Sequence, residues 1–449
     1  MLGAGVGLQP QYSFSALDIL DFPVGFGWDQ GRFPVQVTDI EGEFFSNLMP
    51  RDLVDPAVWT GVAIHVDRVT GDDGNSGLGA IDGDFITAKR TIYSAFVAGN
   101  ATGAPYRVIV KAGEYEESAF TRNGNDEPDQ AVAILGWGGP VRYRTGPFVV
   151  NWSDAGGSYS APVSVVKRVF RTDVLTPDGN YTELVKAVDL VSCKATLGTW
   201  FLDGGTVHVN IGSQPTNDGI ALIRSFHGAR FMTHTSDMYL EDIHCEGGIT
   251  GALHFDPVST RNIVGVNCSF KYSAPSNSNV PLDAVRIRRT DGLVAFFDCD
   301  ASMGAKDGWS FHEDGNSGLH VLLQNCSGLR NGVDPATSCN AFTSHDAIRS
   351  IVLGGTFGLS RNGTEMHCIQ SAQSWLVGVT ATARDVDGTS VAFKCSNQAS
   401  MWLQNTIADA AGAATNYAIE ANAGTVFIRS HTDTAGSYAT SVGGTISAF

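Results

Sequence analysis

The stretch Lys306-Asp307-Gly308-Trp309-Ser310-Phe311-His312-Glu313-Asp314 decides the fold of this 449-residue chain. Its centre alternates apolar and polar side chains, as a half-buried strand does, and it ends in three ionisable residues. Similar tetrapeptides, each opening on an apolar residue, occur before and after it. We interpret them as one strand repeated in successive coils. They are Leu253–Asp256, Val285–Arg288, Trp309–His312, Phe342–His345, Ile369–Ala372 and Phe393–Ser396.

Four cysteines mark a second strand of the same coils. Cys245, Cys268, Cys299 and Cys326 each end a short segment, and the unequal intervals between them are close to one solenoid repeat in length. Strands in a constant order, separated by loops of varying length, are typical of a parallel β-solenoid. Its coils stack roughly 4.8 Å apart, so equivalent side chains form columns along the axis. We predict that the four cysteines stack inward as free thiols, because small thiols bury readily.

Composition supports an all-β chain and excludes some partners. Glycine is abundant, at 52 residues, and charged residues make up only 17% of the chain, which suits many tight turns. The net charge of −17 argues against binding to nucleic acid or to anionic membranes. No apolar run approaches the length of a membrane span, and the first residues lack the basic region of a signal peptide. We therefore expect a soluble protein without membrane insertion.

The chain divides into four parts. Residues 1–60 carry no periodicity, and we interpret them as an irregular attachment segment that docks on a partner such as another protein. Residues 61–125 are predicted to form the cap and the first coil of a β-helix. Residues 126–235 combine early coils with an antiparallel β insertion, which a hairpin pattern over 198–209 indicates. Residues 236–449 contain the regular coils.

The opening of the solenoid has the most specific pattern. A strand over 63–67 is followed by the loop Gly-Asp-Asp-Gly-Asn-Ser-Gly over 71–77, a helical spacing over 87–97, and the strand Tyr-Arg-Val-Ile-Val-Lys-Ala-Gly-Glu-Tyr over 106–115. The loop lacks the full EF-hand pattern, so calcium binding there stays open. This opening resembles that of right-handed parallel β-helix proteins of the pectate-lyase-like superfamily, in which the helix caps the solenoid. The resemblance covers residues 60–440 approximately.

This resemblance implies both a fold and a function. The fold would be all-β: a single-stranded right-handed parallel β-helix with an N-terminal capping helix and an antiparallel β insertion. The same opening is common in bacteriophage tailspike depolymerases. It implies a homotrimeric enzyme of the virion tail that binds and cleaves a bacterial surface polysaccharide, with residues 1–60 attached to a tail or baseplate protein. The alternatives are a secreted bacterial polysaccharide lyase or epimerase, and a non-catalytic glycan-binding adhesin or virion structural protein.

Candidate site residues follow from strand alternation, which places Trp309 and Phe311 inside and Ser310 and His312 outside. Outward columns of adjacent coils then gather ionisable residues. One such column is predicted to be His254, Arg286, Ser310, Thr343, Gln370 and Lys394. The candidate catalytic residues are His312, Glu313, His345 and Asp346. The candidate substrate-binding residues are His254, Asp256, Arg286, Arg288, Arg289, Asp307 and Lys394. No metal site is predicted, because no two cysteines have C-x-x-C spacing, and no cofactor motif is present.

Two reactions would suit these residues. Hydrolysis needs one protonated and one ionised carboxyl group. Glu313 and Asp346, on adjacent coils, would lie near the separation of about 5–5.5 Å that retaining glycosidases use. β-Elimination from a uronic acid needs a cation beside the sugar carboxylate, for which Arg288 or Arg289 would serve. It also needs a base for the C5 proton, such as one of the two histidines.

A structural interpretation competes with both reactions. Arg289 beside Glu313, and Asp256 beside Arg288, could form ion pairs on a solvated face, where each pair contributes only about 0–1 kcal/mol. Two histidines on adjacent coils are harder to explain in that way, and we therefore predict a site.

Overall fold

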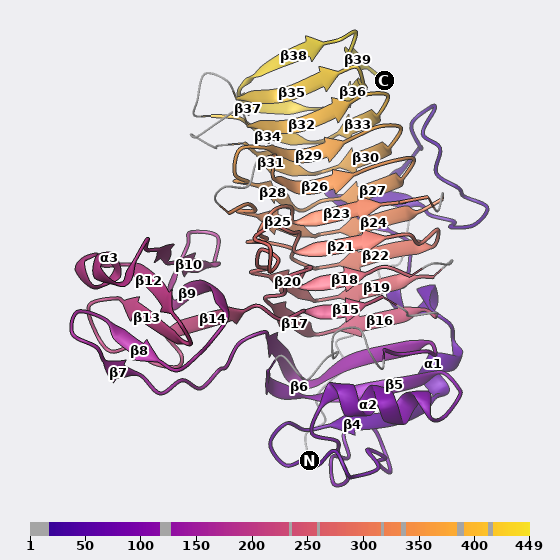
Figure 1. Cartoon of the computed structure of the whole chain (residues 1–449). Coiled ribbons are helices and arrows are strands. Elements are labelled where there is room, and N and C mark those ends of the chain that lie inside the picture. Colours follow the sequence, from indigo (N-terminus) through magenta and orange to yellow (C-terminus); the bar gives the residue numbers. More distant parts are fainter. Residues whose placement is uncertain are drawn as a thin grey trace.

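The computed structural model describes residues 18–116, 127–232, 236–257, 261–315, 318–333, 338–383, 390–411 and 416–449. Parallel strands stack coil upon coil into a β-helix, which confirms the predicted fold class (Figure 1). Three sheets, here called A, B and C, run along its axis. No helix in these ranges has the length and apolar character needed to cross a bilayer.

Sheet A carries the strands that the tetrapeptides predicted. Their inward residues, such as Trp309 and Phe311, are fully buried in the central core. The strands, in spatial order, are β15 (Ala229–Phe231), β18 (Leu253–Phe255), β21 (Val285–Arg288), β23 (Trp309–His312), β26 (Asn340–Ser344), β29 (Thr364–Cys368), β32 (Val391–Ser396), β35 (Tyr417–Asn422) and β38 (Ser437–Ser441).

Sheet B lies beside sheet A, and its strands are apolar on both faces. Its members are β4 (Val62–Val66), β5 (Tyr106–Tyr115), β6 (Val132–Arg144), β16 (Met238–Glu241), β19 (Ile263–Val266), β22 (Leu293–Phe297), β24 (His320–Gln324), β27 (Arg349–Leu353), β30 (Gln373–Val377), β33 (Ser400–Gln404), β36 (Thr425–Arg429) and β39 (Thr445–Ala448).

Sheet C closes the coil. The first of its strands along the chain pairs with β6, and the second pairs with the first. Single bridges through Asp300 connect these two strands to the remaining five. Its strands are β17 (Ile243–Glu246), β20 (Ser269–Lys271), β25 (Ser327–Leu329), β28 (Thr356–Gly358), β31 (Thr380–Thr382), β34 (Ile407–Asp409) and β37 (Thr432–Ala435).

The cysteine column is partly as predicted. All eight cysteines are buried free thiols, and Cys268, Cys299 and Cys326 occupy equivalent positions after paired residues of β19, β22 and β24. Cys245 was aligned wrongly with them, since it pairs with Phe270 of the next coil. The better marker of register is the left-handed turn residue that precedes each cysteine. Asn267 donates its side-chain amide to Asp242, and Asn325 donates to Asp298, so the turns of adjacent coils are joined.

A short helix caps the N-terminal end of the solenoid. Helix α2 (Ile92–Asn100) begins five residues later than the predicted 87–97. Its N-cap, Thr91, accepts a hydrogen bond from the Ser94 amide, and a carboxylate oxygen of Asp73 accepts one from the Thr91 amide at 2.9 Å. An acidic group at a helix N-terminus is electrostatically favourable, so this Asp73 of the glycine-rich loop helps to fix where the helix starts.

The antiparallel insertion projects from the early coils (Figure 1). The predicted hairpin over 198–209 is present as β12 and β13. Its elements are β7 (Ser153–Asp154), β8 (Tyr159–Ala161), β9 (Val166–Leu175), β10 (Tyr181–Glu183), β11 (Val185–Lys186), α3 (Leu190–Ala195), β12 (Thr199–Asp203), β13 (Thr206–Asn210) and β14 (Ile220–Arg224).

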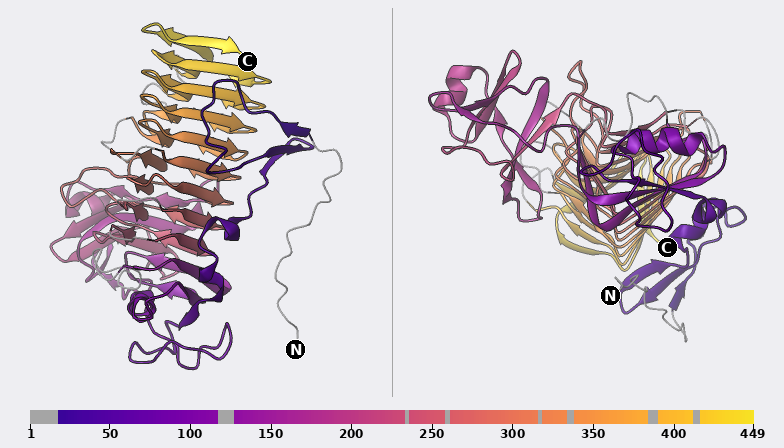
Figure 2. Two further views of the ribbon diagram at one scale, coloured as in Figure 1. Left: turned by 90° about the vertical axis from the view of Figure 1, so that its right-hand side faces the viewer. Right: turned by 90° about the horizontal axis from the view of Figure 1, so that it is seen from below.

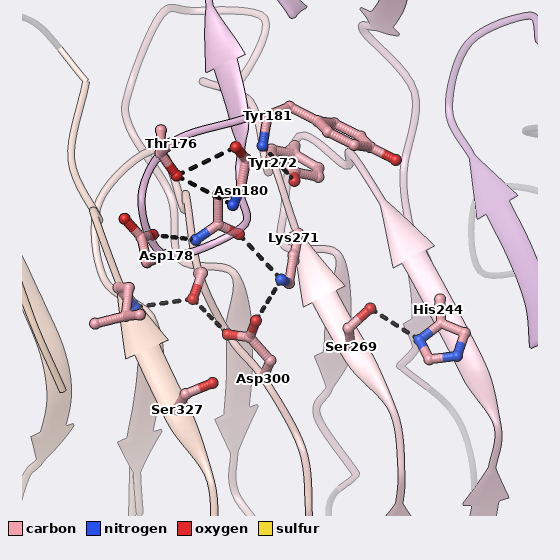
Figure 3. A network of polar contacts seen from close by, with 12 residues as sticks. Thr176, Asp178, Asn180, Tyr181, His244, Ser269, Lys271, Tyr272, Asp300 and Ser327 are labelled. Carbon is pink, nitrogen blue, oxygen red and sulfur yellow. Dashed lines mark hydrogen bonds and ion pairs between the residues drawn. The ribbon is translucent and has the colours of Figure 1, made fainter. Parts of the chain in front are cut away.

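Polar contacts fasten the insertion to sheet C (Figure 3). Lys271 donates to Asn180 at 3.0 Å and also pairs with Asp300. The ring of Tyr181 stacks on that of Tyr272 at 4.8 Å. The insertion is therefore held against the helix by ionic, polar and aromatic contacts together.

Most of the N-terminal segment packs on the solenoid of its own chain. Residues 18–60, here called the strap, lie along the outer face of sheet B, so the surface on which they dock belongs to the same chain (Figure 2). Phe26 packs against Trp375 and Trp402, and the Gly27 amide donates to Gln373 at 2.7 Å. Residues 1–17 of the predicted attachment segment are outside the described ranges. The strap contains β1 (Asp18–Leu20), β2 (Val37–Ile40), β3 (Glu43–Ser46), the 3₁₀ helix η1 (Pro50–Leu53) and α1 (Ala57–Thr60).

Candidate functional site

The outward face of sheet A brings together most of the predicted site residues. Backbone pairing places His254, Arg286, Ser310 and Thr343 in one column, as expected. The second column runs from Asp256 through Arg288 to His312 and His345. Many of these side chains are more buried than a solvated face would allow: Asp256, for example, is only 7% exposed.

Two histidines form the centre of this face. The rings of His312 and His345 stack with their centroids 4.0 Å apart and their planes 15° from parallel. Burial, and then neighbouring His345 and arginines, lower the pKa of His312 to about 2. Burial lowers the pKa of His345 to about 4, and its Nε2 lies 3.0 Å from the Thr343 hydroxyl. Both rings are therefore neutral, and the ring of His312 makes no hydrogen bond to any described residue.

Cations surround the two histidines. Arg288 pairs with Asp314 at 2.5 Å, whereas Arg286 makes no ion pair or hydrogen bond within the described ranges. The Lys306 ammonium lies 3.5 Å from Asp307, and this carboxylate raises the pKa of Lys306. Lys306 is also close enough to contribute to the lowered pKa of both histidines. These cations lie beside acidic groups, Asp307 and Asp314 among them, so charges of both signs meet on this face.

The carboxylates predicted for hydrolysis are engaged with backbone. Glu313 is 4% exposed, and its two oxygens accept hydrogen bonds from the amides of Gly318 at 2.8 Å and Ala347 at 3.2 Å. Asp346 is a turn residue with φ of 61°, and one of its oxygens accepts the Glu313 amide at 2.9 Å. These contacts join adjacent coils, and they leave Glu313 without a free oxygen directed at a substrate.

The remaining acidic and basic candidates form local pairs. Asp256 binds Arg289, which is another left-handed turn residue, in place of the expected Arg288. Lys394 pairs with Glu420 at 2.9 Å, three coils beyond His312. These three candidates therefore lie at the margins of the face, with their charges already compensated.

Asp307 lies beneath the site at the entrance to β23. It is 2% exposed, and one oxygen accepts the Asn340 amide at 2.9 Å. Burial and then the neighbouring Asp283 raise the pKa of Asp307 to about 7. Asp283 is itself 4% exposed, so this carboxyl pair is enclosed by protein.

Three residues of this face also have ligand atoms close enough to be considered as a cation site. Ligand atoms of His312, Asp314 and Asp346 lie within 4.8 Å of one another. Arg288 already neutralises Asp314, and backbone amides occupy one oxygen of Asp346. A divalent ion would have to displace these donors, so the residues fit a metal poorly.

Sequence reasoning missed three residues of this face. His367 replaces Gln370 in the outward column, because β29 pairs Met366 with Phe342 and Thr343 with His367; the predicted strand over 369–372 was therefore out of register. Its signal was the apolar–polar–apolar pattern of Met366-His367-Cys368. Arg230 precedes the column on β15 in the same pattern. Lys306 was quoted in the deciding stretch but received no role.

Comparisons with known proteins add a resemblance in shape. A solved structure named "Glycoside hydrolase" matches with a TM-score of 0.46 and 9% sequence identity, over 86% of this chain and 96% of that chain. At this level the match carries no information about the reaction. No family model matches the chain, and no curated protein matches it significantly.

Proposed function

We propose that the outward face of sheet A is the active site of a polysaccharide-cleaving enzyme, and that it works by β-elimination on a polymer that contains uronic acid. One observation carries the proposal: a pair of neutral, stacked histidines, one with an unengaged ring, lies among cations. Elimination needs an unprotonated base and positive charge close together, because the C5 proton leaves beside a carboxylate.

The chemistry would proceed at the sugar ring of a bound uronate. Arg288, exchanging Asp314 for the substrate, neutralises its carboxylate together with Lys306, which makes the C5 proton more acidic. His312 removes that proton, and the electron pair of the C5–H bond forms the C4=C5 double bond as the C4–O bond breaks. The departing oxygen takes up a proton to become the hydroxyl of the shortened chain. The negative charge of the substrate raises the pKa of His312, which makes it a stronger base only once the polymer is bound.

Hydrolysis is the second candidate, favoured by the raised pKa of Asp307 beside Asp283. One protonated and one ionised carboxyl group is the arrangement that glycosidases use. Both carboxyls, however, are at most 4% exposed, so a sugar could reach them only if the surrounding chain moved. The stacked histidines require no such movement, and elimination is therefore preferred.

The biological setting is a further proposal, supported by the resemblance of residues 60–440 to tailspike-like β-helices. We propose that the polymer is a bacterial surface polysaccharide, that the chain acts as a homotrimer, and that it serves in a virion tail. A secreted lyase or epimerase would use the same site chemistry. A glycan-binding adhesin would bind the same polymer without cleaving it.

Single substitutions test the reaction. His312→Ala should lower the cleavage rate by about 10²–10⁴-fold, the usual contribution of a general base. His244→Ala is the matched control, since that histidine bonds Ser269 on sheet C, away from the site. Cleavage is followed on a panel of capsular and lipopolysaccharide samples, with mass spectrometry of the fragments.

The products separate the candidate reactions. Elimination gives an unsaturated uronate that absorbs ultraviolet light and is lighter than the hydrolytic product by one water. Hydrolytic products, or a rate in His312→Ala within a few-fold of the parent, would contradict the mechanism.

A further inference from the structure

The N-terminal end of the outward column contains basic residues in three successive coils. Arg230 of β15, His254 of β18 and Arg286 of β21 are in backbone register, so their side chains follow one another along the axis. Coils are about 4.8 Å apart, which puts Arg286 one coil and His254 two coils away from Ser310 and the histidine pair. We call these three residues the N-terminal column.

His254 is a buried polar side chain without a partner. It is 6% exposed, and neither ring nitrogen has a hydrogen-bond partner. The nearest carboxylate oxygen, on Asp256, is 3.9 Å away, and that carboxylate already binds Arg289. Burial, followed by Arg286 and Arg230, lowers the pKa of His254 well below its usual value. A donor or acceptor buried in this way normally has a partner, because leaving it unpaired costs about 1–3 kcal/mol.

Arg286 has the complementary property of a cation without an ion pair among the described residues. It is half-buried, its Nε has no hydrogen-bond partner, and burial lowers its pKa. Of the carboxylates around it, Asp256 binds Arg289 and Asp314 binds Arg288, whereas Asp283 acts on Arg286 through its charge alone, without forming an ion pair. A buried cation is normally paired, since desolvating it alone costs several kcal/mol. His254 and Arg286 together therefore offer unused hydrogen-bond donors and a positive charge.

We propose that the N-terminal column is a subsite for an acidic substituent of the polysaccharide, either a carboxylate or a sulfate. An anion there would accept hydrogen bonds from Arg286 and from a ring nitrogen of His254, and it would compensate the arginine charge. This inference rests on the proposed function for its substrate, and it adds that the enzyme reads a second acidic group away from the bond that it breaks. The polymer would then lie along the axis of sheet A, with acidic groups on sugars that are separated by one or two coils.

The subsite also has a kinetic meaning. Binding energy gained at a sugar remote from the reacting bond can position the reacting sugar, so a chain without a second acidic group should react poorly even where its cleaved residue is a uronate. The N-terminal column would therefore select polyanionic polymers over those with isolated uronates.

Anion binding can be tested apart from cleavage. The full chain carrying His312→Ala is titrated with D-glucuronate, inorganic sulfate and neutral methyl glucoside at constant ionic strength and pH. Binding is followed through the ring signals of ¹³C-labelled histidines, and the His254 signal is identified by its loss in His254→Phe. We expect glucuronate or sulfate, but not the glucoside, to shift the His254 signal. Glucuronate alone would identify a carboxylate site, and sulfate alone a sulfate site.

Variants locate the effect. Adding Arg286→Gln should weaken the anion response of His254 at least tenfold, whereas Arg171→Gln, which removes a paired arginine of the insertion, should leave it unchanged. A His254 signal that no anion moves, or that moves equally in the Arg286→Gln background, would overturn the subsite. Anion binding with no polysaccharide cleaved by the wild-type chain would instead remove the proposed function and leave the subsite in place.

Discussion

At the scale of single residues, His312 and His345 show how one side chain type can have quite different chemistry in different surroundings. An imidazole in water has a pKa near 6.5, so it is partly charged at neutral pH. Here burial and nearby cations hold both rings neutral far below that value. The free enzyme therefore keeps its base unprotonated over a wide pH range, at the expense of basicity until an anionic substrate arrives.

This gives a prediction for the pH dependence of kcat/KM, which reports the free enzyme. A base with a lowered pKa loses activity only as pH falls through that lowered value. We expect kcat/KM to stay level from pH 7 down to about 5. It should fall toward pH 4, because His345 then gains a proton and its charge lies against the ring of the base, His312. Initial rates on one cleavable polymer across this range would measure it. An acid limb near pH 6.5 would mean that the rings titrate like exposed imidazoles.

The position of a side chain could be predicted from the sequence more reliably than its function. Alternation along Trp309–His312 correctly gave the outward position of His312, and stacking of coils gave its closeness to His345. Glu313 had the right chemistry for an acid, but its oxygens bind amides of Gly318 and Ala347. Those donors come from chain segments whose position depends on loop paths, and loop paths are not encoded in strand periodicity.

At the scale of elements, the limits of prediction lie in register. A two-residue period identifies strands well, but a coil whose loop differs in length can be displaced without breaking the pattern. That is how 369–372 was taken for the strand that is actually β29, and how Cys245 was aligned with the wrong coil. The covering of sheet B by the strap left a clearer signal, which lies in the sequence of the covered strands. The continuous apolar run of β22, Leu-Val-Ala-Phe-Phe, is typical of a strand covered on both faces.

The strap gives a prediction at this scale. Phe26 is 9% exposed and contacts Trp375 and Trp402, so Phe26→Ala should lower the free energy of unfolding by about 3 kcal/mol. Val24 is two residues away and 96% exposed, and Val24→Ala should change it by less than about 0.5 kcal/mol. Urea unfolding of both variants provides the measurement. Equal midpoints for the two variants would show that the strap contributes little to stability.

At the scale of the whole molecule, the insertion projects from the side of sheet C, and the strap lies along sheet B (Figure 1). The molecule is acidic overall, and the cations on the face of sheet A lie among acidic side chains. A polyanion would therefore be held by local contacts with those cations, against the general field of the chain.

Our proposal of a trimer belongs to this scale. Three parallel copies would present three sites to one repeating polymer, and their joint binding would exceed that of a single site. Light scattering at micromolar concentration should therefore give three times the chain mass of 47.6 kDa. A particle with the mass of one chain would contradict the proposal.

The contact between Phe26 and Trp402 sets an order of events during synthesis. Phe26 leaves the ribosome early, whereas its partner on β33 follows almost four hundred residues later. While the coils assemble in sequence, the strap has no complete surface to cover, and the apolar outer face of sheet B stays bare. Closing so long a loop is slow compared with adding one more coil. The strap is made before the coils that it covers and is thus among the last segments to reach its place, and a nascent chain is most open to aggregation just before that happens.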